Sequence, residues 1–134
     1  MKCIMNLRTD NRGAAMIEFA IALPVLIFII YGIFESAMLL KASAGMQHAL
    51  GEGARRATIF PTPDSTTVST KVSESLFGME NAKTGFPQIS VADGNNATQN
   101  WYTIGVTYQK DVNFLFLPSR TVTIQHSKRV YTAQ

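Results

Sequence analysis

The longest apolar stretch in the chain runs from Ala14 to Phe34 and contains a single charged residue, Glu18. At about 1.5 Å per residue, a helix over this stretch is long enough to cross a hydrocarbon layer of about 30 Å. The pattern therefore predicts a transmembrane helix over residues 14–34. A charge inside such a segment costs at least ~2.5 kcal/mol by insertion scales, so Glu18 is a candidate functional residue.

The helical pattern continues beyond the apolar run, where small and apolar residues recur at spacings of three and four: Leu39, Ala42, Met46, Ala49, Gly53 and Ala57. This periodicity predicts that the helix continues as an amphipathic stalk over residues 35–58. A helix over residues 14–58 would be roughly 67 Å long, which is more than a membrane needs. The outer half is therefore expected to support a small head formed by residues 59–134.

Four small residues form a ridge along the predicted stalk: Gly45, Ala49, Gly53 and Ala57. Because their spacing is four, they lie on one helix face, where another backbone can approach closely. Glycine lowers the stability of a helix by about 1 kcal/mol relative to alanine, so we expect close packing to explain its presence here. Two partners fit this ridge: the protein's own sheet, or the helix of a neighbouring subunit.

A short second helix is predicted after the break at Pro61 and Pro63. Asp64 or Ser65 can cap it, and Gly78 can end it. The apolar residues of the expected range, 64–79, lie on one face of this helix: Val68, Val72, Leu76 and Met79. The pattern is that of a small amphipathic helix packed on a core.

From Phe86 onward the period of the apolar residues changes to two, which is typical of strands. Three runs show it: Ile89 and Val91; Tyr102, Ile104, Val106 and Tyr108; and Val122 and Ile124, in a run that ends near Tyr131. The Asp93–Asn96 segment predicts a turn between the first two runs. We therefore expect an α+β fold in which the stalk helix covers an antiparallel sheet of about three strands.

An apolar segment, Phe114-Leu115-Phe116-Leu117, joins the second and third predicted strands. If exposed, such a run would be a contact site for a partner protein or a membrane. If buried, it would close the end of the sheet, and this is the interpretation that the small size of the head favours.

Charge predicts the orientation in the membrane. Lys2, Arg8 and Arg12 against Asp10 give residues 1–13 a charge of +2, within a total of +3 for the chain. Basic residues before an apolar helix favour a cytoplasmic N-terminus, so residues 1–13 are expected to be a cytoplasmic leader and the head extracytoplasmic. Cys3 is the only cysteine, so the head has no disulfide.

Enzymatic chemistry has little support in the sequence. His48 and His126 are the only histidines and have no further ligand at metal-binding spacing. No Gly-x-Ser-x-Gly turn and no phosphate-binding glycine loop is present. We therefore expect no catalytic residues, metal, cofactor or small-molecule substrate, and the small net charge argues against nucleic acid as a partner.

Cleavage at the start of the apolar run would place two opposite charges close together. If the chain were cut after Gly13, Ala14 would carry a free ammonium at the membrane edge, one helical turn from Glu18. The two charges could neutralise each other, within one chain or between neighbouring subunits. Pairing between subunits would set the register of a helical assembly.

These residues carry a resemblance to a known family. Gly13 with Glu18 and Phe19 before an apolar helix resembles the class III prepilin peptidase site of type IV pilin-like proteins. The stretch RGAAMIEFAIALPVL at residues 12–26, with Glu35 and the later GEGARR at 51–56, is similar to the TadE-like minor pseudopilins of the Tad (Flp) pilus machinery. Phe19 stands where the major Flp pilins typically carry tyrosine, and the head is longer than theirs.

The resemblance implies cleavage between Gly13 and Ala14 by a prepilin peptidase at the bacterial inner membrane. It implies as partners the other pilins and pseudopilins and the inner-membrane proteins that assemble the pilus. The implied role is in pilus biogenesis or as a minor component of the surface filament.

Two other interpretations remain open at this point. A secreted or periplasmic binding module would be cleaved after the Ala42-Ser43-Ala44 site, although the apolar run is longer than a usual signal core and contains Glu18. An anchor that is never processed could serve as a membrane scaffold. The mature N-terminus distinguishes these cases.

Overall fold

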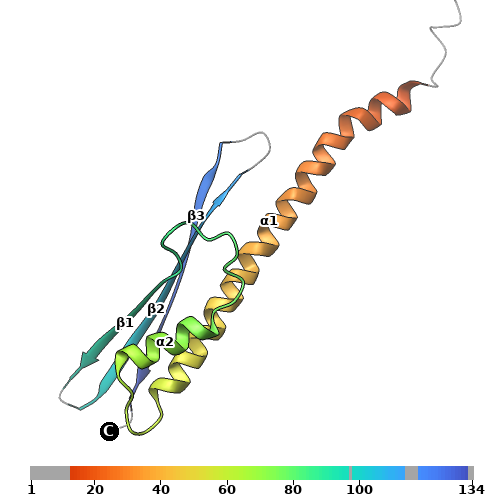
Figure 1. Cartoon of the computed structure of the whole chain (residues 1–134). Coiled ribbons are helices and arrows are strands. Elements are labelled where there is room, and N and C mark those ends of the chain that lie inside the picture. Colours follow the sequence, from red (N-terminus) through yellow and green to blue (C-terminus); the bar gives the residue numbers. More distant parts are fainter. Residues whose placement is uncertain (1–12, 97, 114–117, 133–134) are drawn as a thin grey trace, which may run out of the picture.

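The computed structural model describes residues 13–96, 98–113 and 118–132. Within these residues, the chain forms helix α1 (Ala14–Ala57), helix α2 (Ser65–Ser75) and strands β1 (Gln88–Asn95), β2 (Asn100–Val112) and β3 (Arg120–Tyr131). Figure 1 shows the sheet lying along one half of α1, with the other half of the helix extending beyond it. The predicted α+β fold is confirmed.

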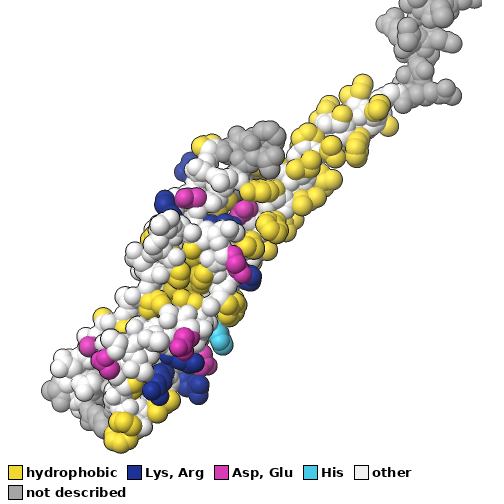
Figure 2. Space-filling view, viewed as in Figure 1, with side chains coloured by type: hydrophobic (Ala, Val, Ile, Leu, Met, Phe, Trp, Pro, Cys, Tyr) yellow, Lys and Arg dark blue, Asp and Glu magenta, His cyan; other side chains and the backbone are white. Residues whose placement is uncertain are grey.

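Helix α1 is continuous over 44 residues, with Pro24 inside it. Every residue from Gly13 to Ile30 is exposed, and Figure 2 shows an apolar surface over this protruding half. Among the described residues, α1 is the helix that is long and apolar enough to cross a membrane. Its second half is different, because Ala42, Met46 and Ala49 are completely buried there.

Helix α2 is shorter than predicted and ends at Ser75 instead of residue 79. The backbone becomes extended at Leu76, and Gly78 has a positive φ of 74°. Leu76 and Met79 still pack against the core, so their periodicity comes from burial on a common surface and not from a continuing helix. This extended segment crosses α1, as described below.

The strands form an antiparallel sheet in the order β1-β2-β3. The predicted turn between β1 and β2 lies further along the chain, because β1 continues to Asn95. The side chain of Asn96 accepts hydrogen bonds from the backbone N–H groups of Thr98 and Gln99, at 3.1 and 2.7 Å. The Asn96 side chain therefore stabilises the connection in place of a turn at Asp93–Asn96.

The core lies between the inner face of the sheet and the two helices. Ile104, Val106 and Tyr108 of β2 point into it, and Val68 and Val72 of α2 are completely buried there. Burial of such side chains contributes about 1.5–3 kcal/mol each relative to exposure. The second half of α1 thus covers the sheet, as the sequence predicts, with α2 packed beside it (Figure 1).

Candidate functional site

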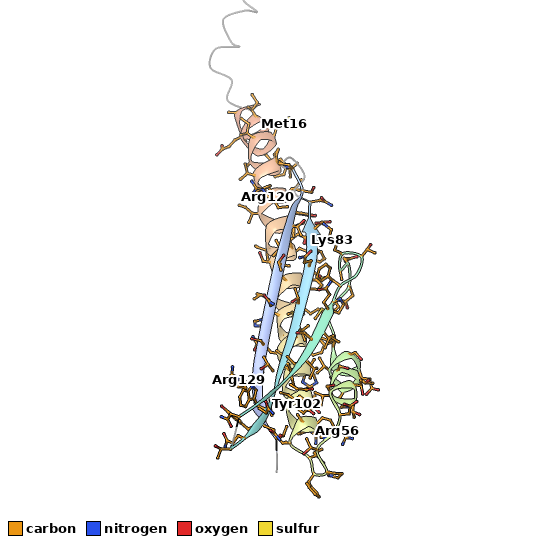
Figure 3. The ribbon with its side chains drawn as sticks, turned by 90° about the vertical axis from the view of Figure 1, so that its left-hand side faces the viewer. Met16, Arg56, Lys83, Tyr102, Arg120 and Arg129 are labelled. Carbon is orange, nitrogen blue, oxygen red and sulfur yellow. The ribbon has the colours of Figure 1, made fainter. Side chains whose placement is uncertain are left out.

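The predicted processing segment lies at the free end of α1. Gly13 precedes the helix, which begins at Ala14, and the side chains of Glu18 and Phe19 are exposed. Glu18 forms no hydrogen bond or ion pair with the residues that the structure describes. Figure 3 shows Met16 at this end of the molecule, remote from the head. The segment is therefore accessible to partners outside the chain.

The four-residue ridge is covered by the protein's own chain. A Cβ atom at Gly45 would lie 1.9 Å from the carbonyl oxygen of Phe77, and one at Gly53 would lie 2.4 Å from Cγ2 of Val72. Ala49 and Ala57 are completely buried. The close neighbour is mainly α2 and the segment after it, while the sheet contributes Ile104, 3.5 Å from the Gly53 position.

Much of the opposite face of the second half of α1 is exposed. A Cβ atom at Gly51 would meet no other atom within 4 Å, and the side chain of Leu40 is 71% exposed. Further exposed residues continue the spacing of three and four toward the apolar half: Ile33, Ala37, Ala44 and Gln47. This spacing is the one by which two helices pack side by side.

A buried ion pair joins α1 to the sheet where the apolar run ends. Lys110 Nζ of β2 lies 2.6 Å from Glu35 Oε2, and the two side chains are only 7% and 12% exposed. Tyr31 donates a second hydrogen bond to Glu35 Oε1, at 3.1 Å. With both carboxylate oxygens bonded, the charge of Glu35 is compensated inside the protein.

Tyr108 lies near the same cluster. Its hydroxyl donates to the backbone carbonyl of Glu80, at 3.3 Å. Burial is the main cause that raises the pKa of Tyr108, and the carboxylates of Glu80 and Glu35 add to it. The phenol therefore stays protonated well above neutral pH and remains a hydrogen-bond donor.

Lys110 is a site residue that the sequence patterns left unnoticed. Its position in β2 could have identified it, because it continues the alternation of Tyr102, Ile104, Val106 and Tyr108 toward the core. A lysine on a buried strand face requires a counter-ion. Glu35, the first charged residue after the apolar run, supplies the carboxylate that pairs with it.

The remaining predicted residues divide into two groups. Phe114, Leu115, Phe116 and Leu117 lie outside the described residues. The histidines are in separate places: His48 packs against the ring of Phe77 at 5.7 Å between centroids, and His126 Nε2 lies 2.9 Å from Ser43 Oγ. The described residues contain no group of three or more histidine, cysteine or acidic side chains that could hold a metal ion.

Comparison with known proteins gives one finding that concerns α1. Residues 13–55 match the family model of the TadE-like proteins. Comparison with curated proteins and with solved structures found no match. The matched range begins one residue before α1 and ends in its last turn. The predicted resemblance to the TadE-like family is thus confirmed over residues 13–55.

Proposed function

We propose that this protein is a minor pseudopilin of a Tad (Flp) pilus machine, acting in pilus biogenesis or as a minor component of the filament. The observation that carries the proposal is the coincidence of the TadE-like match with α1. The first half of this helix is an exposed apolar rod, and its second half is built into a head. This division suits a subunit that is anchored first and assembled later.

The membrane placement is part of the proposal. Residues 14–34 would span the inner membrane, residues 1–13 would lie in the cytoplasm, and residues 35–134 would lie outside the membrane. The +2 charge before the helix supports this orientation. The exposed face of α1 around Leu40 and Ala44 would then be available to the helix of another pilin or pseudopilin.

Processing at Gly13 is the first expected outcome. In cells that contain the prepilin peptidase, the mature protein should begin at Ala14, and Gly13→Leu should leave residues 1–13 attached. The expected reason is steric, because leucine would place a branched side chain where the proposed peptidase would meet a residue without a Cβ atom. Intact-mass measurement and N-terminal sequencing check both points.

Gly51→Ala is the matched control, since a Cβ atom at Gly51 meets open space; this variant should be processed normally. A mature N-terminus at Gly45 would support the secreted module and contradict the proposal. An unchanged mass in the presence and absence of the peptidase would support the unprocessed anchor.

Glu18 is proposed to set register in the assembly. Glu18→Gln should be cleaved normally but should enter the filament fraction at about a tenth of the wild-type level or less, because one lost charge pair of ~1.4 kcal/mol corresponds to a tenfold change. Immunoblots of sheared pili and of membranes measure the two pools. Glu74→Gln, on the surface of α2, is the control, and equal incorporation of both variants would refute the register role.

A further inference from the structure

Strand β3 forms one edge of the sheet, because among the described residues it pairs with β2 on one side only. Figure 3 shows β3 as the outermost strand on the side of the sheet away from α2, with Arg120 and Arg129 near its two ends. Strand β1, at the other edge, has 8 residues and packs against α2, whereas β3 has 12 residues. The edge at β3 is therefore the longer and more open one.

The hydrogen-bonding groups of the β3 backbone alternate in direction. The backbone N–H of Thr132 donates to the carbonyl of Asn100, next to β2, at 3.0 Å. In an antiparallel ladder every second residue bonds to the same neighbouring strand, and the pairing of β3 with β2 is continuous from Tyr131 to Arg120. The residues between them point their backbone N–H and C=O groups away from β2: Thr121, Thr123, Gln125, Ser127, Arg129 and Tyr131. All of these are exposed, and their backbone groups form no hydrogen bond with another described residue.

An open groove follows part of this edge. It has a volume of about 250 Å³ and lies between β3 and the second half of α1. Its lining residues are Gln47 and Leu50 of α1 and His126, Ser127 and Lys128 of β3. The space beside the edge is therefore accessible, and the inward side chains of an added strand would lie next to α1.

The middle of the edge has the composition of a strand that pairs readily. Residues 121–127, TVTIQHS, contain β-branched residues and no proline, glycine, acid, lysine or arginine. Segments of six or seven residues with high β-propensity, low charge and no proline associate with other strands when they are exposed. Proteins usually protect such an edge with a bulge, a proline or a charge, and residues 121–127 have none of these. This part of β3 is therefore suited to receive another strand.

The charges of β3 lie at its two ends and have one sign. Arg120 is at the start of the strand, and Lys128 and Arg129 are near its end; all are exposed. None of them forms an ion pair with a described residue. An added strand would thus meet positive charge at both ends and none in the middle. Acidic residues opposite the ends would be stabilised there, whereas lysine or arginine would be repelled.

A second copy of this chain fits the edge less well. In an antiparallel pairing of two β3 strands centred on Gln125, Arg120 would lie diagonal to Lys128 of the second copy, on the same sheet face. The two α1 helices would also point in opposite directions, so they could not enter one membrane from the same side. In a parallel pairing at equal height, the registers place Gln88 of the second copy level with Gln125. Its β1 would then leave residues 120–124 uncovered.

We propose that the free edge of β3 binds an extended segment of a partner protein, which adds a fourth strand to the sheet. This segment has an uncharged middle and acidic residues at both ends. The backbone groups of β3 that point away from β2 provide the affinity, and the acidic residues fix the position of the segment through Arg120 and Lys128. The interaction goes beyond the pilus role proposed above, which does not depend on it.

Synthetic peptides test this site on the full chain in detergent micelles. One peptide, as long as β3, alternates threonine and valine in its middle and has glutamates at both ends; the other has lysines in place of the glutamates. Titration of the labelled peptides gives the affinities, and NMR follows amide hydrogen exchange. The glutamate peptide should slow exchange at Thr123 and Gln125 by at least about tenfold, whereas Val122 and Ile124, already bonded to β2, should change little. The lysine peptide should bind at least about tenfold more weakly.

Two variants separate the backbone from the charges. Gln125→Pro removes an N–H that points away from β2, so the ladder with β2 is retained while strand addition is blocked; affinity for the glutamate peptide should fall by at least about tenfold. Lys128→Glu should weaken binding of the glutamate peptide by about fivefold and strengthen binding of the lysine peptide. It tests the site even if Gln125→Pro fails to fold. Lys71→Glu, on the surface of α2, is the matched control and should bind as the wild type does.

Three results would overturn the proposal. Equal affinities for the two peptides would remove the role of the charges at the ends of β3. Binding without slower exchange at Thr123 and Gln125 would place the peptide elsewhere on the protein. Protection of these N–H groups that increases with protein concentration, in the absence of peptide, would show that a second copy of the chain occupies the edge.

Discussion

Replacing Lys110 by methionine is expected to lower the free energy of unfolding by about 3–5 kcal/mol, the usual cost of removing one partner of a buried ion pair. Glu35 would remain in a site where its side chain is 12% exposed, with the Tyr31 hydroxyl as its remaining partner among the contacts described. Urea denaturation of the full chain in detergent micelles, followed by Trp101 fluorescence, measures this loss.

Two further variants test whether the loss of stability comes from leaving Glu35 buried without its counter-ion. In Glu35→Gln with Lys110→Met, no buried charge is left, so the double variant should be more stable than Lys110→Met alone. Lys41→Met removes the pair with Glu80, whose side chains are 49% and 54% exposed, and should cost no more than about 1 kcal/mol. Equal losses for Lys110→Met and Lys41→Met would show that burial of the Glu35 pair does not contribute.

Gly45→Ala is expected to be the second most damaging change. The new Cβ atom would lie 1.9 Å from the carbonyl oxygen of Phe77, and this neighbour is backbone, so a rotamer change cannot relieve the clash. The segment after α2 would have to move, which we expect to cost at least about 1–3 kcal/mol. The same denaturation measurement applies.

Gly51→Ala provides the control on the same helix. Its Cβ atom would meet nothing within 4 Å, so only helix propensity changes, and stability should rise by about 1 kcal/mol. The two substitutions are chemically identical and lie six residues apart on α1, yet their effects should have opposite signs. A gain in stability for Gly45→Ala would mean that the Phe77 segment does not pack on α1 as described.

Periodicity was sufficient to predict most of the fold. The spacing of three and four from Leu39 to Ala57 indicated a continuing helix, and the period of two from Ile89 onward indicated the strands. Both signals are strong because each element has one buried face. The limits of α2 were harder to predict, since Leu76 and Met79 are buried on the same surface whether or not the backbone between them is helical.

The partner of the ridge could not be predicted from spacing. Gly45 and Gly53 indicate that another backbone or side chain packs closely against this face of α1. A small residue does not indicate whether that neighbour belongs to the same chain or to another subunit. Lys110 was missed for a related reason: its strand position indicates burial, while its counter-ion is 75 residues away in the sequence. The roles of Gly13 and Glu18 depend on partner proteins and stay predictions, as does that of Phe114–Leu117.

The alignment of α1 with the sheet has a mechanical consequence. The helix runs alongside β2 and β3 (Figures 1 and 3), and the buried contacts follow it from Glu35 to Ala57. A force that pulls along the helix axis therefore acts on all of these contacts in shear at the same time, and does not break them one after another. When the membrane helix is pulled, the head should move with it as one rigid body. The Glu35–Lys110 pair is the buried contact nearest to the membrane helix.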